Sequence, residues 1–269
     1  MHTLTPTEHA TNGTAPGADT STRTAARVAG LGYAALFFLA MFANFVVRLG
    51  LVDDDDPAAT VDNIVADELM FRGGLAAFVA VFVIDVAVAW GLYVLLRPGG
   101  QARSLLAAWF RMAYTVMLGV AATFMFLALQ LSTDGALASG LDAAERASWT
   151  SLAVQAFDYT WLVGLVAFGI HLVLVGRLMA SAMGARVLGL LLAVVGVAYV
   201  FDTAAHTLYS NYADHADLFL AIVATPSIIA ELWFTFWLLR RGWGREDDTT
   251  ELAAAGTATT ERLTVGTAN

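Results

Sequence analysis

The chain contains no cysteine and no lysine, and charged residues occupy only 14% of its 269 positions. Without cysteine there is no disulfide, thiolate nucleophile or thiolate metal ligand, so a metal site would need His, Asp or Glu side chains. The 14 basic residues, all arginine, are outnumbered by 23 acidic ones, and the formal net charge is -9. An acidic chain lacks the basic surface on which nucleic-acid binding depends, so no nucleic-acid partner is expected.

What the chain has in abundance is apolar sequence. Hydrophobic residues make up 58% of it, more than an ordinary soluble domain carries. A helix that crosses a bilayer needs about 20 predominantly apolar residues, and six segments reach that length. We therefore predict an all-α protein, a bundle of six transmembrane helices in the lipid bilayer. The expected spans are 27–50, 73–96, 104–130, 151–176, 187–209 and 218–240.

Polar segments flank these spans at both ends of the chain. Residues 1–22 are rich in Thr, Gly, Pro and Ala without apolar periodicity, and residues 246–269 are similar. Neither segment has the apolar material that a folded core requires. The sequence therefore predicts one membrane domain over residues 23–245 between two disordered tails.

Arginines are concentrated in alternate connections between the spans. Cytoplasmic loops of membrane proteins carry the excess of Lys and Arg, so this alternation places both termini in the cytoplasm of a plasma-membrane protein. An even number of spans agrees with that placement. The predicted cytoplasmic side carries Arg23, Arg27, Arg97, Arg103, Arg177, Arg186, Arg240, Arg241 and Arg245, whereas the outer side carries Arg48, Arg72 and Arg146 among many acids.

The first outer connection contains a further helical pattern. After the acidic run at 53–56, Asp56 can cap a helix whose first residue is Pro57. Apolar residues then recur at helical spacing, which is typical of an amphipathic helix. We predict a short helix on the outer surface between spans 1 and 2, with an apolar face of Val61, Ile64, Val65 and Leu69.

Seven ionisable residues fall inside the predicted spans. An ionisable group at membrane depth is costly, so each indicates either a functional site or a hydrogen bond that specifies helix packing. The seven residues are Asp85, Arg111, Asp158, His171, Asp202, His206 and Glu231.

Asp202 and His206 form the most distinctive pair. A spacing of four residues places both on one face of a helix, with Tyr199 near the same stripe. At 1.5 Å per residue, Asp158 and Asp202 both lie roughly 10 Å below the outer surface. The short link between spans four and five, and glycines at 169, 176, 189 and 196, favour close packing of those spans. We therefore predict a polar site of Asp158, Tyr199, Asp202 and His206.

The remaining ionisable residues leave two pairings open. Arg111 can pair with Asp85 of the preceding span or with Glu231 of the last span, which follows a kink expected at Pro226. His171 lies about 20 Å along the helix axis from Asp158, so it is expected to make a packing hydrogen bond elsewhere.

The chain resembles a bacterial and archaeal membrane family, the domain of unknown function 4386 family, from about Arg23 to Trp243. The resemblance implies a prokaryotic multi-pass membrane protein, and it implies no activity, substrate or cofactor. Positions matching polar residues of the family pattern are Asp85, His171, Asp202, His206 and Glu231. The matching stretches include DPAATVDNIVADELMFRGG, VIDVAVAWGLYVLLRP, FGIHLVLVGRLM, RVLGLLLAVVGVAYVFDTAAH and IAELWFTFWLL.

Three functional classes are compatible with these patterns. The first is a transport or proton-linked membrane protein, with a small solute or a proton on a path lined by buried polar residues. The second is a membrane-embedded metal-dependent hydrolase with Asp202 and His206 as ligands, although zinc sites normally have three protein ligands. The third is a non-catalytic membrane partner or scaffold whose polar residues specify packing. No cofactor is expected in the first or third class.

Overall fold

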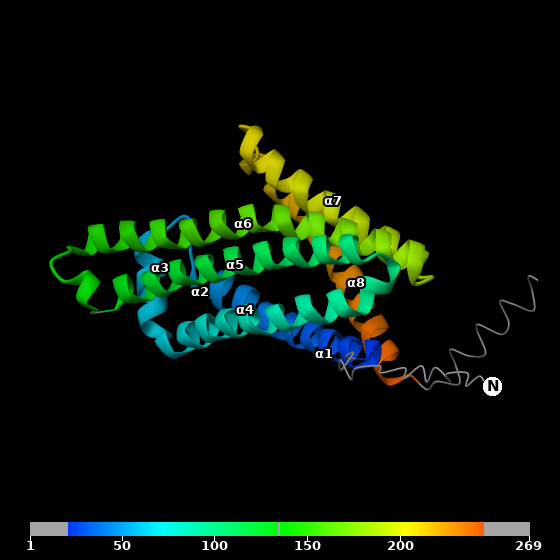
Figure 1. Ribbon diagram of the computed structural model, residues 1–269. Coiled ribbons are helices and arrows are strands. Elements are labelled where there is room, and N and C mark those ends of the chain that lie inside the picture. The colour runs from blue at the N-terminus through cyan, green and yellow to red at the C-terminus, as the bar shows by residue number, and fades with distance from the viewer. Residues whose placement is uncertain (1–20, 134, 245–269) are drawn as a thin grey trace, which may run out of the picture.

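A computed structural model describes residues 21–133 and 135–244 of the protein (Figure 1). Six of its helical segments are long and apolar enough to cross a membrane, which confirms the predicted six-span all-α fold. The long helices are α1 (Thr22–Ala40, continued by the π-helix η1, Met41–Arg48, and α2, Leu49–Leu51), α4 (Glu68–Leu96, continued by η2, Arg97–Gly99), α5 (Gln101–Ser132), α6 (Ala143–Ala182), α7 (Arg186–Leu208) and α8 (Ala216–Trp243).

The predicted tails lie almost wholly outside the described residues. Two residues assigned to the first tail do belong to the fold, because Thr22 begins α1 and the Ser21 hydroxyl accepts a hydrogen bond from the Thr24 backbone N–H, 3.2 Å away. Serine is among the preferred N-cap residues, since its oxygen satisfies an amide that has no partner within the helix. The membrane domain therefore begins slightly earlier than predicted.

The six long helices form a closed ring. Each of α1, α4, α5, α6, α7 and α8 packs against the next in that order, and α8 returns to α1. Packing is most extensive between α5 and α6 and least extensive between α7 and α8. In Figure 1, α7 diverges from α6 toward its C-terminal end. A ring that is tight on one side and loose on the other can enclose a space.

Glycines set the tight side of the ring. A Cβ atom added to Gly169 would meet the carbonyl oxygen of Gly196, and one added to Gly176 would meet that of Gly189. The reverse contacts hold as well, so the backbones of α6 and α7 touch at both levels. Small residues permit this approach in membrane helices, and the predicted close packing of these spans is confirmed.

The two ends of the bundle differ in charge. We call the end with Arg27, Arg97, Arg186 and Arg241 the basic end, and the end with residues 53–56 the acidic end. At the basic end α1 and α8 are tied together: Arg23 Nη2 donates to the Gly244 carbonyl at 2.6 Å and Arg27 Nε to the Gly242 carbonyl at 2.7 Å. The same end of this helix pair is close-packed at Gly30, where an added Cβ would lie 3.0 Å from the backbone nitrogen of Leu239.

The short helix predicted in the first outer connection is α3 (Pro57–Ala66). Asp56 caps it as expected, since its Oδ1 accepts hydrogen bonds from the backbone N–H groups of Ala58 and Ala59 at 3.0 Å each. The predicted apolar face is wrong in part. The helix packs against α5 and α6 and has Thr60 and Ile64 buried, whereas Val65 is 51% exposed and Leu69 belongs to α4 and is 85% exposed.

The first span departs from regular α-helix at η1. Its eight residues form a π-helix, a rare geometry that occurs mostly as short bulges and often at functional sites. The wider turn changes the direction of the side chains that follow it. Asn44, the amide residue of this segment, is turned toward the space inside the ring.

Candidate functional site

A cavity of about 320 Å³ lies inside the ring of helices, bordered by all six long helical segments. Its walls are mainly aromatic and aliphatic. Polar groups occur at two levels, toward the basic end and at the acidic end, which is the usual composition of a ligand pocket. The polar and charged residues that border it are Tyr33, Asn44, Asp85, Arg111, Tyr114, Trp161, Tyr199, Asp202, Tyr212, Ser227 and Glu231.

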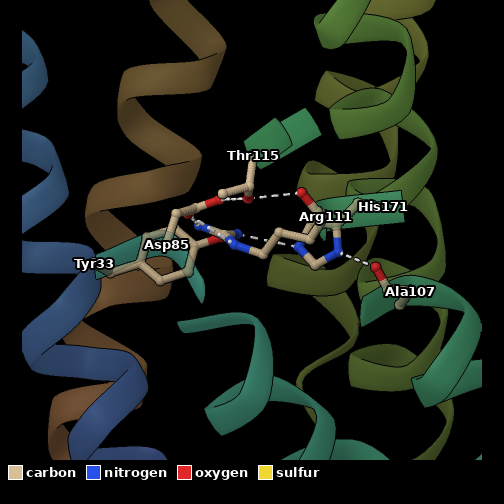
Figure 2. A network of polar contacts seen from close by, with 6 residues as sticks. All are labelled: Tyr33, Asp85, Ala107, Arg111, Thr115 and His171. Atoms are coloured by element: carbon tan, nitrogen blue, oxygen red, sulfur yellow. Dashed lines mark hydrogen bonds and ion pairs between the residues drawn. The ribbon is translucent and has the colours of Figure 1, made fainter. Parts of the chain in front are cut away.

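The deepest level of the cavity is an ion pair between α4 and α5. Arg111 Nε donates to Asp85 Oδ1 at 3.0 Å, and its Nη2 donates to the same oxygen (Figure 2). Both side chains are about 2% exposed. The structure therefore realises the first of the two predicted pairings of Arg111. A long arginine side chain reaches its partner even though side chains on antiparallel helices lean in opposite directions.

Further partners complete this ion pair. Arg111 Nη1 donates to the Tyr33 hydroxyl of α1 at 2.6 Å and lies 3.2 Å from His171 Nε2 of α6. The Thr115 hydroxyl donates to Asp85 Oδ2 (Figure 2). The guanidinium also lies over the ring of Tyr33, 4.7 Å from its centroid. We call Tyr33, Asp85, Arg111, Thr115 and His171 the arginine network.

The protonation state of His171 follows from its partners. A guanidinium can only donate, so Nε2 accepts, and Nδ1 therefore carries the proton that it donates to the Ala107 carbonyl at 2.8 Å. That arrangement is the neutral imidazole. The packing hydrogen bond predicted for His171 is present, and its partner lies on α5.

Glu231 presents a carboxylate to the same cavity from α8. Within residues 21–133 and 135–244, its side chain has no hydrogen-bond partner, and the charges nearest to it are Arg111 and Asp85. One turn before it, Ser227 Oγ donates to the Val223 carbonyl at 2.5 Å. Glu231 is therefore held near the arginine network without being part of it.

Two other buried polar atoms border the cavity without partners. Asn44 Oδ1 and Trp161 Nε1 make no hydrogen bond within the described residues. Buried polar groups are nearly always hydrogen-bonded, and an exception calls for an explanation such as a ligand or water at the site. An amide acceptor, an indole donor and a carboxylate thus face one space with their hydrogen-bonding capacity free.

The acidic end of the cavity is formed by Asp202 of α7 and Tyr212 of the connection that follows. The Tyr212 hydroxyl donates to Asp202 Oδ1 at 2.9 Å. Burial, the hydrogen bond to Asp202 and the charge of that carboxylate raise the pKa of Tyr212 to about 12. The phenol is therefore a proton donor to Asp202 at neutral pH.

The predicted grouping of Asp158 with Asp202 and His206 differs from the arrangement in the structure. Asp158 turns toward α1 and pairs with Arg48 at 2.5 Å. His206 is exposed and packs between the rings of Tyr159 and Tyr212, at centroid distances of 5.9 and 4.4 Å. The predicted common level of Asp158 and Asp202 is wrong as well: Thr203 lies at Leu162 and His206 at Tyr159, so Asp158 lies about one helical turn nearer the acidic end than Asp202.

Tyr199 and Asp202 border the cavity, whereas Asp158 and His206 do not. Of the other predicted residues, Asp85, Arg111 and Glu231 border the cavity. His171 does not border it but contacts Arg111, which does. Among the described residues there is no group of three or more His, Asp or Glu side chains placed to hold a metal ion. Asp202 and His206 therefore have no third protein ligand there.

Sequence reasoning missed several residues of the cavity. Tyr33, Asn44, Tyr114, Trp161 and Tyr212 contribute to its walls and were not predicted. One signal was available for Asn44, because an amide inside the apolar run FFLAMFANFVV is a polar group at membrane depth. Tyrosine and tryptophan carry no such signal, since they are also ordinary packing residues.

The fold and the cavity together define a multi-pass helical membrane protein with an acidic, aromatic space inside its bundle. The chain belongs to the family described as "Domain of unknown function (DUF4386)", whose model matches residues 28–242. An uncharacterised protein of Archaeoglobus fulgidus is 28% identical over 163 residues, which cover 60% of this chain and 79% of the relative. No solved structure matches the chain.

Proposed function

We propose that the protein is a proton-linked transporter of the prokaryotic plasma membrane, with its basic end and both termini in the cytoplasm. The charge difference between the two ends supports this orientation, because cytoplasmic loops carry the excess of arginine. The family and the six spans set the class of protein, and the cavity supports the transport role.

One observation carries the proposal, the Glu231 carboxylate with no hydrogen-bond partner among the described residues. A carboxylate at membrane depth is costly unless it binds a proton or a cation. Glu231 faces the cavity, so either partner can reach it without crossing packed side chains. Proton relays of transporters use acidic residues placed in this way.

In this proposal, Glu231 is reached through the acidic half of the cavity, which Asp202 and Tyr212 border. Toward the basic end the arginine network fills the bundle, and the contacts of Arg23 and Arg27 tie α1 to α8. Transport requires a second conformation with access from the basic end. The α1 and α8 pair is the gate in this proposal, because two hydrogen bonds and one close-packed glycine hold it shut.

The test is proton flux into liposomes that contain the purified protein and a pH-sensitive dye. Wild-type protein should carry flux under a membrane potential, and Glu231→Gln should reduce it by about tenfold or more, since the amide cannot release a proton. Glu68→Gln is the matched control, because Glu68 pairs with Arg72 at the exposed start of α4, and its flux should equal wild type.

Flux in the wild type that does not exceed that of empty liposomes would overturn the proposal. Flux that survives in Glu231→Gln would do the same, because the carboxylate would then have no part in it. The scaffold class predicts a different result, in which substitutions in the cavity lower thermal stability and flux is absent throughout.

A further inference from the structure

We propose that the cavity binds a small hydrophobic organic cation, which enters from the bilayer through the gap between η1 and α8. This inference rests on the proposed function, since it names a class of solute that the Glu231 carboxylate holds in the cavity. Three features support it: the charge of the cavity, the aromatic residues of its walls, and the way in which α1 and α8 pack in the ring.

The charge of the cavity favours a cation. Asp85 and Arg111 neutralise each other, and His171 is neutral by its hydrogen bonds. Two carboxylates remain, Glu231 and Asp202, and neither has a basic partner among residues 21–133 and 135–244. A carboxylate that faces an apolar cavity without a counter-ion attracts a positive group more strongly than a fully solvated acid does.

The walls favour a cation with an apolar body. Aromatic faces attract ammonium groups through their ring quadrupoles, and recognition of quaternary ammonium ligands by aromatic cages is the common use of that attraction. A volume of about 320 Å³ lies at the lower limit of ligand pockets, so the ligand is small. Aromatic residues that border the cavity outside the arginine network include Phe37, Phe45, Tyr114, Trp161, Tyr199 and Tyr212.

One of the two unpaired polar atoms that border the cavity, Asn44 Oδ1, fits the same ligand class. Asn44 Oδ1 is an acceptor without a donor, and a protonated amine or the polarised C–H groups of a quaternary ammonium would face it favourably. It lies in η1, whose π-helical turn directs it inward. Glu231, in α8, borders the same cavity as Asn44.

The entry route follows from how α1 and α8 pack. Their contacts are at the basic end, where Gly30 meets Leu239 and the ring of Tyr33 packs on that of Phe234 at 5.2 Å. Toward the acidic end, residues of η1 and of α8 border the cavity instead. Phe45 of η1 is 47% exposed and Ile228 of α8 is 39% exposed, and both also border the cavity. In this proposal, the cavity opens between these two residues toward the lipid-facing surface of the ring.

Binding is tested with radiolabelled benzyltrimethylammonium and the full-length protein in detergent, by equilibrium dialysis. We expect saturable binding to the wild type, about tenfold weaker binding to Glu231→Gln, and a smaller loss for Asp202→Asn at the outer end. Benzylsulfonate, which has the same aryl group and the opposite charge, should not bind.

The entry route is tested with a matched pair of substitutions on α8. Ile228→Trp places a large ring in the gap and should slow the association of benzyltrimethylammonium by about tenfold, measured by quenching of intrinsic fluorescence. Ile229→Trp, one residue along, lies on an exposed position that does not border the cavity, and should leave association unchanged. Equal rates in the two variants would overturn the lateral route.

The outcomes separate this inference from the proposed function. If benzyltrimethylammonium does not bind, or if benzylsulfonate binds equally well, the organic-cation inference is wrong. Glu231-dependent proton flux is then still tested separately by the liposome assay. If the cation binds in a Glu231-dependent way while liposomes show no proton flux, the ligand class is correct and the transporter proposal is wrong. Folding of each variant is checked by its thermal unfolding midpoint.

Discussion

The arginine network and the Glu231 side of the cavity are neighbouring regions with opposite chemistry. In the network, Arg111 donates through Nε and both terminal nitrogens, and its carboxylate partner accepts from two residues. Across the cavity, Glu231 and Asn44 Oδ1 accept no hydrogen bond within the described residues. Both regions consist of polar groups in an apolar bundle. Only in the arginine network do these groups find their hydrogen-bond partners among the described residues.

The difference indicates what each region is for. A completed network holds α1, α4, α5 and α6 in one arrangement, because any other rotation of these helices would leave a buried charge without a partner. An incomplete set of polar groups is costly to stability and is retained where something outside the chain completes it. We therefore assign packing to the network and ligand binding to the groups that face it.

The largest expected effect is loss of one member of the network. Arg111→Met leaves the Asp85 carboxylate buried and unpaired, so the free energy of unfolding should fall by about 3 kcal/mol or more. The measurement is unfolding by a denaturing detergent in mixed micelles. The double variant Asp85→Leu with Arg111→Met removes both charges and should recover more than half of that loss. Equal losses in the single and double variants would contradict an ion-pair role.

A smaller effect of opposite sign is expected in the cavity. Asn44→Leu replaces an unpaired buried acceptor by an apolar group, and the free energy of unfolding should rise by about 1 kcal/mol. Asn63→Leu is the control, because Asn63 Nδ2 donates to the Leu51 carbonyl at 3.3 Å and its loss should destabilise. The same unfolding assay serves both. If Asn44→Leu lowers the free energy of unfolding, the Asn44 amide has a hydrogen-bond partner within the protein. The contrast between the arginine network and the Glu231 side of the cavity would then be wrong.

The smallest effect is expected at Tyr212. Tyr212→Phe removes one partly exposed hydrogen bond to Asp202, and the loss should be below about 1 kcal/mol near neutral pH. Its pH dependence gives a sharper test. Because the pKa of Tyr212 is raised from about 10 to about 12, the unfolded chain loses this proton first, and stability falls as pH rises above 10. The phenylalanine variant should show a shallower fall, and equal slopes would argue against the contact.

Several features of the fold could be predicted because they depend on positions along the chain. Six apolar runs define six spans, Asp56 before Pro57 defines a helix start, and four glycines define the contact between α6 and α7. Each of these depends on composition and spacing alone. The relative depth of polar groups on neighbouring spans could be predicted less well: Tyr159 meets His206, so Asp158 lies about one helical turn nearer the acidic end than Asp202.

The partners within the bundle could not be predicted, because they depend on rotation about the helix axes and on which helices are neighbours. Asp158 pairs with Arg48 and not with Asp202, and His171 of α6 contacts Arg111 of α5. Composition and the length of the apolar runs were enough to predict the six-span all-α fold. Arg111 has hydrogen-bond partners and Glu231 has none among the described residues, and this difference arises only when the helices pack together. That outcome depends on the closure of six helices into a ring, which no single helix encodes.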